Sequence, residues 1–102
     1  MHKSKLLQHL RLLDTLELKR LLQFLKSPLY NANPRIVDFY LLLRKWHPDY
    51  KTPKLNKEKV FQQLFPNRDY DHQKLLNLMS SFTALLRQYL QILQLEKEEQ
   101  TK

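Results

Sequence analysis

The stretch DHQKLLNLMSSFTALLRQYLQILQLE, residues 71–96, decides the fold class. Its apolar residues recur every three or four positions, which is the pattern of a helix that packs in a bundle or coiled coil. They stand at Leu75, Leu78/Met79, Phe82, Leu85/Leu86, Tyr89 and Ile92/Leu93. Asp71 is placed to cap the start of this helix. At 1.5 Å per residue, the helix would be roughly 39 Å long.

That length exceeds what a compact domain of this size needs. We therefore expect the last turns to protrude, with exposed leucines that require a second subunit or a following domain to cover them. The predicted partner-binding residues are Leu86, Leu90, Leu93 and Leu95. The alternative is that the first helix of the chain folds back and covers them.

The composition extends the helical prediction to the whole chain. Leucine occupies 24 of the 102 positions, whereas Val and Ile together occupy four. Unbranched side chains favour helices and β-branched ones favour strands. There is no glycine, so the turns of β-hairpins lack their usual residue. A chain of this length fits one all-α domain over residues 1–102.

Pro, Asn and Asp residues divide the chain into about five helices, which we expect to form an orthogonal or irregular bundle with a long C-terminal helix. The third helix, from the Asn33-Pro34 start to about Trp46, is apolar around most of its circumference and is expected at the centre. The other predicted helices run from about Ser4 to Leu13, from a Thr15 cap to before Pro28, and from an Asn56 cap to Pro66.

The positive charge lies in the first part of the chain. Residues 1–59 contain thirteen Lys or Arg against five Asp or Glu, and residues 60–102 contain five of each, so the net charge of +8 belongs to the first segment. Such a field attracts nucleic acid, anionic membranes or acidic proteins. Phosphate contacts by these cations, with bases stacked on nearby tyrosines, would support nucleic-acid binding. The predicted nucleic-acid-binding residues are Lys19, Arg20, Lys26, Arg35, Arg44 and Lys45.

No catalytic, cofactor or metal site is predicted. The chain has no cysteine for thiolate chemistry or a zinc site, and no glycine for a phosphate-binding loop. Its four histidines form no pair at helical spacing. The N-terminal segment lacks an apolar run, so neither a signal peptide nor a membrane span is expected. The lack of cysteine fits a cytoplasmic protein.

Lys45-Trp46-His47-Pro48-Asp49 locally resembles the loop by which J-domain co-chaperones stimulate a chaperone ATPase. The basic helix face and the other motifs of J-domains are missing, so we favour a structural interpretation. In that interpretation Pro48 stops the helix, Asp49 forms the turn and Trp46 is buried.

A wider set of motifs resembles the N-terminal helical domain of a group of uncharacterised bacterial proteins, chiefly from Bacteroidota, over about residues 15 to 95. The motifs are Lys19-Arg20 through Phe24-Leu25, Ser27-Pro28-Leu29-Tyr30-Asn31, His47-Pro48-Asp49-Tyr50, Pro53-Lys54-Leu55, Lys57-Glu58-Lys59-Val60-Phe61, Leu64-Phe65-Pro66, Tyr70-Asp71 and Asn77-Leu78-Met79-Ser80. The resemblance implies a domain of a larger bacterial protein, or a short relative of one. It implies no activity and no functional residue.

The sequence thus predicts a non-enzymatic helical module that binds protein, either a second copy or a following domain. The alternative is a nucleic-acid-binding domain that uses the basic surface of the first three helices. No membrane partner and no small-molecule substrate is expected.

Overall fold

A computed structural model describes residues 5–47, residue 50 and residues 56–100. Residues 99 and 100 are described by their backbone only. It contains five helices, α1 Lys5–Arg11, α2 Thr15–Lys26, α3 Pro34–Arg44, α4 Lys57–Leu64 and α5 His72–Gln100. The described residues include no strand. The predicted all-α fold with a long C-terminal helix is therefore confirmed.

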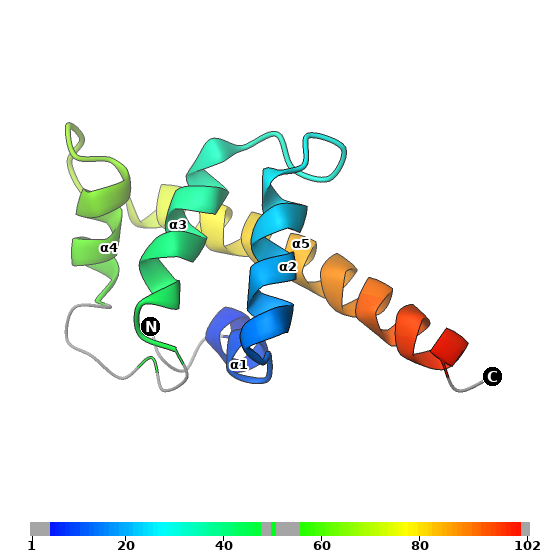
Figure 1. Ribbon diagram of the computed structural model, residues 1–102. Coiled ribbons are helices and arrows are strands. Elements are labelled where there is room, and N and C mark those ends of the chain that lie inside the picture. The colour runs from blue at the N-terminus through cyan, green and yellow to red at the C-terminus, as the bar shows by residue number, and fades with distance from the viewer. Residues whose placement is uncertain (1–4, 48–49, 51–55, 101–102) are drawn as a thin grey trace.

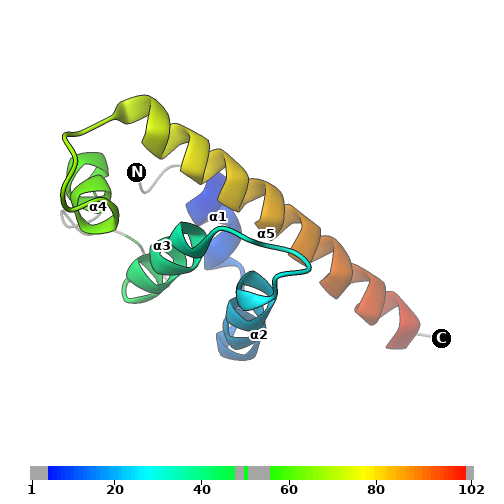
Figure 2. The same ribbon diagram turned by 90° about the horizontal axis from the view of Figure 1, so that it is seen from above.

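The long helix α5 organises the molecule. In Figure 1, α2, α3 and α4 stand side by side and α5 passes across them, and Figure 2 shows these three helices nearly end-on along one side of α5. Helix α5 packs against all four other helices, whereas α3 packs against α2, α4 and α5. The prediction that α3 is central is thus only partly right, because α5 contacts more elements and Leu41 of α3 is exposed.

Buried side chains from all five helices form one continuous hydrophobic core. Helix α5 contributes residues spaced by three and four, as its sequence pattern predicts. They are Leu75, Leu78, Phe82, Leu86, Tyr89 and Leu93. No charged residue is fully buried among the described residues. The interior is therefore apolar apart from tyrosine hydroxyl groups, and each of those requires a hydrogen-bond partner.

Asn and Asp side chains cap the starts of α2, α3, α4 and α5. The predicted caps Asn33, Asn56 and Asp71 are confirmed, because their side chains accept hydrogen bonds from the backbone N–H groups of Arg35, Lys59 and Lys74. The prediction that Thr15 caps α2 is wrong. The cap is Asp14, whose carboxylate accepts from the Glu17 N–H while the Glu17 carboxylate accepts from the Asp14 N–H. Thr15 is already the first helical residue.

Two tyrosines dock α3 and α5 onto α2. The Tyr40 hydroxyl donates to the Leu18 carbonyl oxygen over 2.6 Å, and the Tyr89 hydroxyl donates to the Glu17 carbonyl oxygen over 2.7 Å. Both rings are almost completely buried. Because the two carbonyl groups are consecutive in the chain, a single turn of α2 fixes the positions of both neighbouring helices.

A groove along α5

The leucines predicted to bind a partner mostly lie inside the domain. Leu86 and Leu93 belong to the core, Leu90 is half-buried, and only Leu95 is well exposed, at 60 %. The expectation of exposed leucines in the last turns is therefore wrong for Leu93 and right for Leu95, and Leu86, a predicted partner-binding residue, is also covered by this chain. The reason is that α2 crosses the second half of α5, where Tyr89 binds the Glu17 carbonyl and Glu96 binds Arg20, and the turns of α5 beyond this crossing extend past the other helices (Figure 1).

The predicted nucleic-acid-binding cations do not gather into one patch. Arg20 binds Glu96 near the end of α5 with 2.7 Å between Nη2 and Oε1, and this hydrogen bond raises the pKa of Arg20 and lowers that of Glu96. Arg35 instead lies beside Phe65, opposite Lys74 on α5. Lys74 and Glu96 are 22 residues apart on α5, which is about 33 Å along a helix. The structure thus places Arg20 and Arg35 at distant sites.

The other four cations of that prediction are spread over α2 and α3. Lys19 and Lys26 are exposed on α2, Arg44 is half-buried in the last turn of α3, and Lys45 caps the C-terminus of α3. In Figure 1, α2 and α3 run in opposite directions, so Arg44 and Lys45 lie at the other end of α3 from Lys26.

The segment predicted to resemble a J-domain loop lies partly outside the described residues, which include neither Pro48 nor Asp49. His47 is half-buried, and its Nδ1 atom lies 2.8 Å from the hydroxyl oxygen of the buried Tyr50. Tyr50 has a φ of 54°, a left-handed conformation that is unusual for a bulky residue. Trp46 is half-buried against the core rather than fully enclosed.

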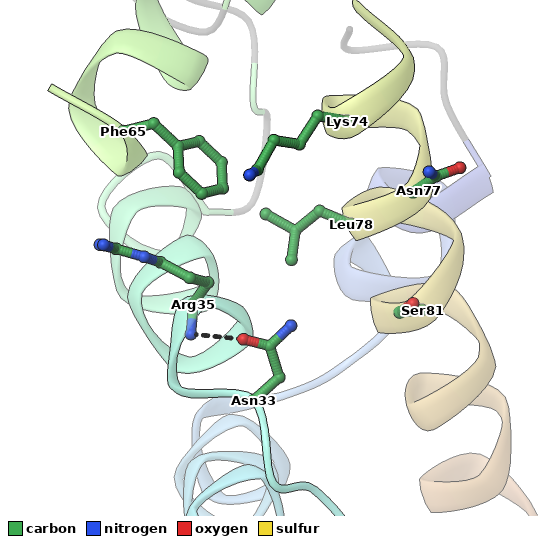
Figure 3. A pocket seen from close by; sticks show the side chains of 7 residues that line it. All are labelled: Asn33, Arg35, Phe65, Lys74, Asn77, Leu78 and Ser81. Carbon is green, nitrogen blue, oxygen red and sulfur yellow. Dashed lines mark hydrogen bonds between the residues drawn. The ribbon is translucent and has the colours of Figure 1, made fainter. Parts of the chain in front are cut away.

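One candidate site is a cleft between α3, α5 and the end of α4 (Figure 3). It encloses about 350 Å³ and is lined by Asn33, Arg35, Phe65, Lys74, Asn77, Leu78 and Ser81. Figure 3 shows Lys74 and Leu78 extending from α5 toward Phe65, with Arg35 reaching the same ring from α3. We call this cleft the basic end, because it forms one end of a longer groove that is described below.

Two cations share one aromatic ring at the basic end. The Arg35 guanidinium carbon lies 5.3 Å from the centre of the Phe65 ring, and the Lys74 ammonium nitrogen lies 4.9 Å from it. Both distances are in the range of cation–π attraction. Arg35 has a carboxylate of Asp38 at 3.7 Å, but Lys74 forms no ion pair with any described residue. No acidic side chain lines the basic end.

A second cavity adjoins the basic end and shares Asn33 and Ser81 with it. It is a broad, open depression of about 650 Å³ between the 30–34 segment and α5, and most of its lining is apolar. It is lined by Tyr30, Asn31, Ala32, Asn33, Pro34, Ile36, Ser81, Ala84 and Leu85. We call this cavity the apolar end. Together the two cavities form one groove, the α5 groove, which follows α5 from Lys74 to Leu85 over about 16 Å.

A well-ordered turn forms the rim of the apolar end. The Asn31 amide nitrogen donates to the carbonyl oxygens of Leu25 and Asn33, and its amide oxygen accepts from the Asn33 backbone N–H. The Tyr30 ring stacks on Phe24 with 4.5 Å between the ring centres. Nevertheless Leu29 is 89 % exposed and Tyr30 is 44 % exposed. The turn therefore presents two apolar side chains to solvent on a backbone that is already fixed.

Sequence reasoning did not identify the α5 groove. Its walls come from the turn at Tyr30, the end of α4 at Phe65 and the first half of α5, so no local spacing connects them. Ser27-Pro28-Leu29-Tyr30-Asn31 belongs to the motifs of the bacterial group, and that resemblance implies no function for it. One available signal is Lys74, a cation directly before the apolar seam of α5.

Among the described residues, no three His, Asp or Glu side chains lie close enough to hold a metal ion. In the same part of the chain, no helix is long and apolar enough to span a membrane. Comparison of the chain with protein-family models, with curated proteins and with solved structures gave no match.

Proposed function

We propose that this chain is a non-enzymatic protein-interaction module that binds a segment of a partner protein in the α5 groove. The observation that carries the proposal is the division of this groove into a basic and an apolar end. Such a surface is complementary to a segment with an acidic residue on one side and an apolar residue on the other.

The fixed rim supports this proposal. Binding a flexible segment costs conformational entropy, and the cost is smaller when one side of the interface is already ordered. The hydrogen bonds of Asn31 and the stacking of Tyr30 on Phe24 hold the turn before any ligand arrives. Tyr30, which lines the apolar end and is 44 % exposed, is therefore ready to contact an apolar side chain of the partner.

The alternative function, nucleic-acid binding, has less support. A basic surface for a duplex or a single strand needs cations along a continuous path, whereas Arg20 and Arg35 lie at distant sites. The cytoplasmic location and the relationship to the bacterial group remain predictions. The first rests on the absence of cysteine and the second on the motifs of residues 15 to 95.

A selection from a library of random 12-residue peptides displayed on phage tests the proposal. Two neighbouring serines on α5 provide matched variants, because both are exposed but they line different cavities. Ser81 lies where the two ends of the α5 groove meet, whereas Ser80 lines a separate cavity beside α1. Ser81→Trp fills the groove, and Ser80→Trp adds the same bulk outside it.

We expect selected peptides to contain Asp or Glu a few residues from an apolar side chain. They should bind the wild type and Ser80→Trp equally and Ser81→Trp at least about tenfold more weakly, with unchanged circular dichroism for both variants. Selected peptides that bind Ser81→Trp as tightly as the wild type would show that the groove is not the binding site.

A further inference from the structure

The basic end of the α5 groove offers hydrogen-bond donors almost exclusively. Arg35 and Lys74 can only donate. The amide oxygens of Asn33 and Asn77 already accept hydrogen bonds, from the Arg35 backbone N–H and from the Gln73 amide over 3.0 Å each. Each amide therefore has its NH₂ group left for a ligand. Acceptor capacity in this cleft is limited to the Ser81 hydroxyl and the second lone pair of each amide oxygen.

The charge of the basic end is only partly compensated, because Arg35 has a carboxylate oxygen of Asp38 at 3.7 Å whereas Lys74 forms no ion pair with a described residue. Two cations lie within 5.3 Å of the centre of one ring, and no carboxylate lines the cleft between them. Phe65 and Leu78, which are both buried, form its apolar wall, and charges interact more strongly beside such a wall than in bulk water. An anion with several acceptor atoms could contact Lys74 and Arg35 on either side of the Phe65 ring and offset the remaining positive charge.

We propose that the basic end binds the phosphate group of a phosphorylated serine or threonine in the partner segment, an inference that rests on the proposed function above. A phosphomonoester carries a charge of about −1.5 to −2 at neutral pH and has three strong acceptor oxygens. It can use both cations and the amide donors together. A carboxylate, with one charge and two oxygens, can use only part of this set.

The position of the basic end fits a phosphate that is part of a longer ligand. The cleft and the apolar end are neighbours that share Asn33 and Ser81 in their linings. A peptide with its phosphate between Arg35 and Lys74 can therefore continue along α5 and place an apolar side chain beside Tyr30 and Leu85. A free nucleotide or a lipid headgroup would leave this second cavity unused.

Nuclear magnetic resonance titration with inorganic phosphate tests the anion site by itself. We expect saturable shifts of the backbone signals of Arg35, Lys74 and Asn77, with no comparable change in sodium chloride of equal ionic strength. Lys74→Gln and Arg35→Gln should each weaken binding about tenfold, the order of effect expected when a charge-assisted hydrogen bond is lost. Arg87→Gln, on the same helix but lining the cavity beside α1, should leave binding unchanged.

A peptide library with phosphoserine, glutamate or serine at one central position tests the ligand class. We expect the phosphoserine set to bind at least about tenfold more tightly than the glutamate set, and Lys74→Gln to abolish this preference. Equal binding of the phosphoserine and glutamate sets would overturn the proposal. So would equally tight binding of a 5′-phosphorylated single-stranded oligonucleotide with the same dependence on Lys74, because the ligand would then be nucleic acid.

The two proposals can fail separately. If unphosphorylated peptides bind in a manner that Ser81→Trp prevents, while phosphate adds no affinity, the inference about phosphate is wrong and the proposed function stands. If neither peptide set binds, both proposals are wrong, even if inorganic phosphate occupies the cleft.

Discussion

At the start of α2, the side chains of Asp14 and Glu17 each accept a hydrogen bond from the other's backbone N–H. This reciprocal arrangement satisfies two N–H groups that the helix leaves without an internal partner. Asp14→Ala should therefore lower the free energy of unfolding by about 1 kcal/mol. Thr15→Ala changes the adjacent residue without removing either hydrogen bond, so its effect should be much smaller.

Urea denaturation followed by circular dichroism measures both variants. If Thr15→Ala is the more destabilising of the two, the structure assigns the wrong cap. The sequence holds a signal that separates these adjacent residues, because Glu17 stands three positions after Asp14, the spacing of a capping box, whereas Leu18 stands three positions after Thr15. The backbone decides between them, since Asp14 has extended φ and ψ angles of −83° and 178° while Thr15 is already helical. Asn33, Asn56 and Asp71 had no such competitor beside them, and there the prediction was correct.

At the scale of the element, α5 packs its regular seam of apolar residues against the rest of the same chain. Leu86→Ala should lower the free energy of unfolding by about 2–5 kcal/mol, because Leu86 is completely buried and its truncation leaves a cavity. Leu95→Ala should have little effect, since Leu95 is 60 % exposed. Thermal or urea denaturation of the two variants provides the comparison, and equal destabilisation would contradict the packing of α5.

This helix shows how far sequence reasoning reaches. The three-and-four spacing from Leu75 to Leu93 predicts that a helix exists and which of its faces is apolar. It does not state what covers that face, because an apolar seam looks the same whether it packs on another subunit or on the same chain. The answer depends on α2, whose Glu17 carbonyl and Arg20 side chain bind Tyr89 and Glu96 of α5. The α5 groove was missed for a related reason, since Tyr30, Phe65 and Lys74 come together only in the folded chain.

At the scale of the whole molecule, the buried tyrosines predict instability in alkali. Burial raises the pKa of Tyr50 and of Tyr89 to about 12, from an ordinary value of 10.0, and also raises the pKa of Tyr40. Between pH 10, the ordinary tyrosine pKa, and pH 12, the folded chain keeps hydroxyl protons on Tyr50 and Tyr89 that the unfolded chain has released. The free energy of unfolding should therefore be unaffected by these groups below pH 10, and should fall as the pH rises from 10 toward 12.

Tyr89→Phe isolates one part of this effect. At neutral pH the variant should lose about 1 kcal/mol, because its ring no longer donates to the Glu17 carbonyl. Above pH 10 its stability should fall less steeply than that of the wild type, because one raised pKa has been removed. Urea midpoints measured across this range for both proteins would refute the interpretation if the two curves remained parallel.

The docking of Tyr40 and Tyr89 on consecutive carbonyl groups of α2 also limits how related chains can vary in length. An extra residue in a helix turns everything beyond it by about 100°. If one residue were inserted after Leu18, both hydroxyl groups would keep their acceptors, but Leu21 and Phe24 would rotate out of the core. We therefore expect natural relatives to gain or lose residues between helices and to keep the number of residues from Asp14 to Leu25 constant.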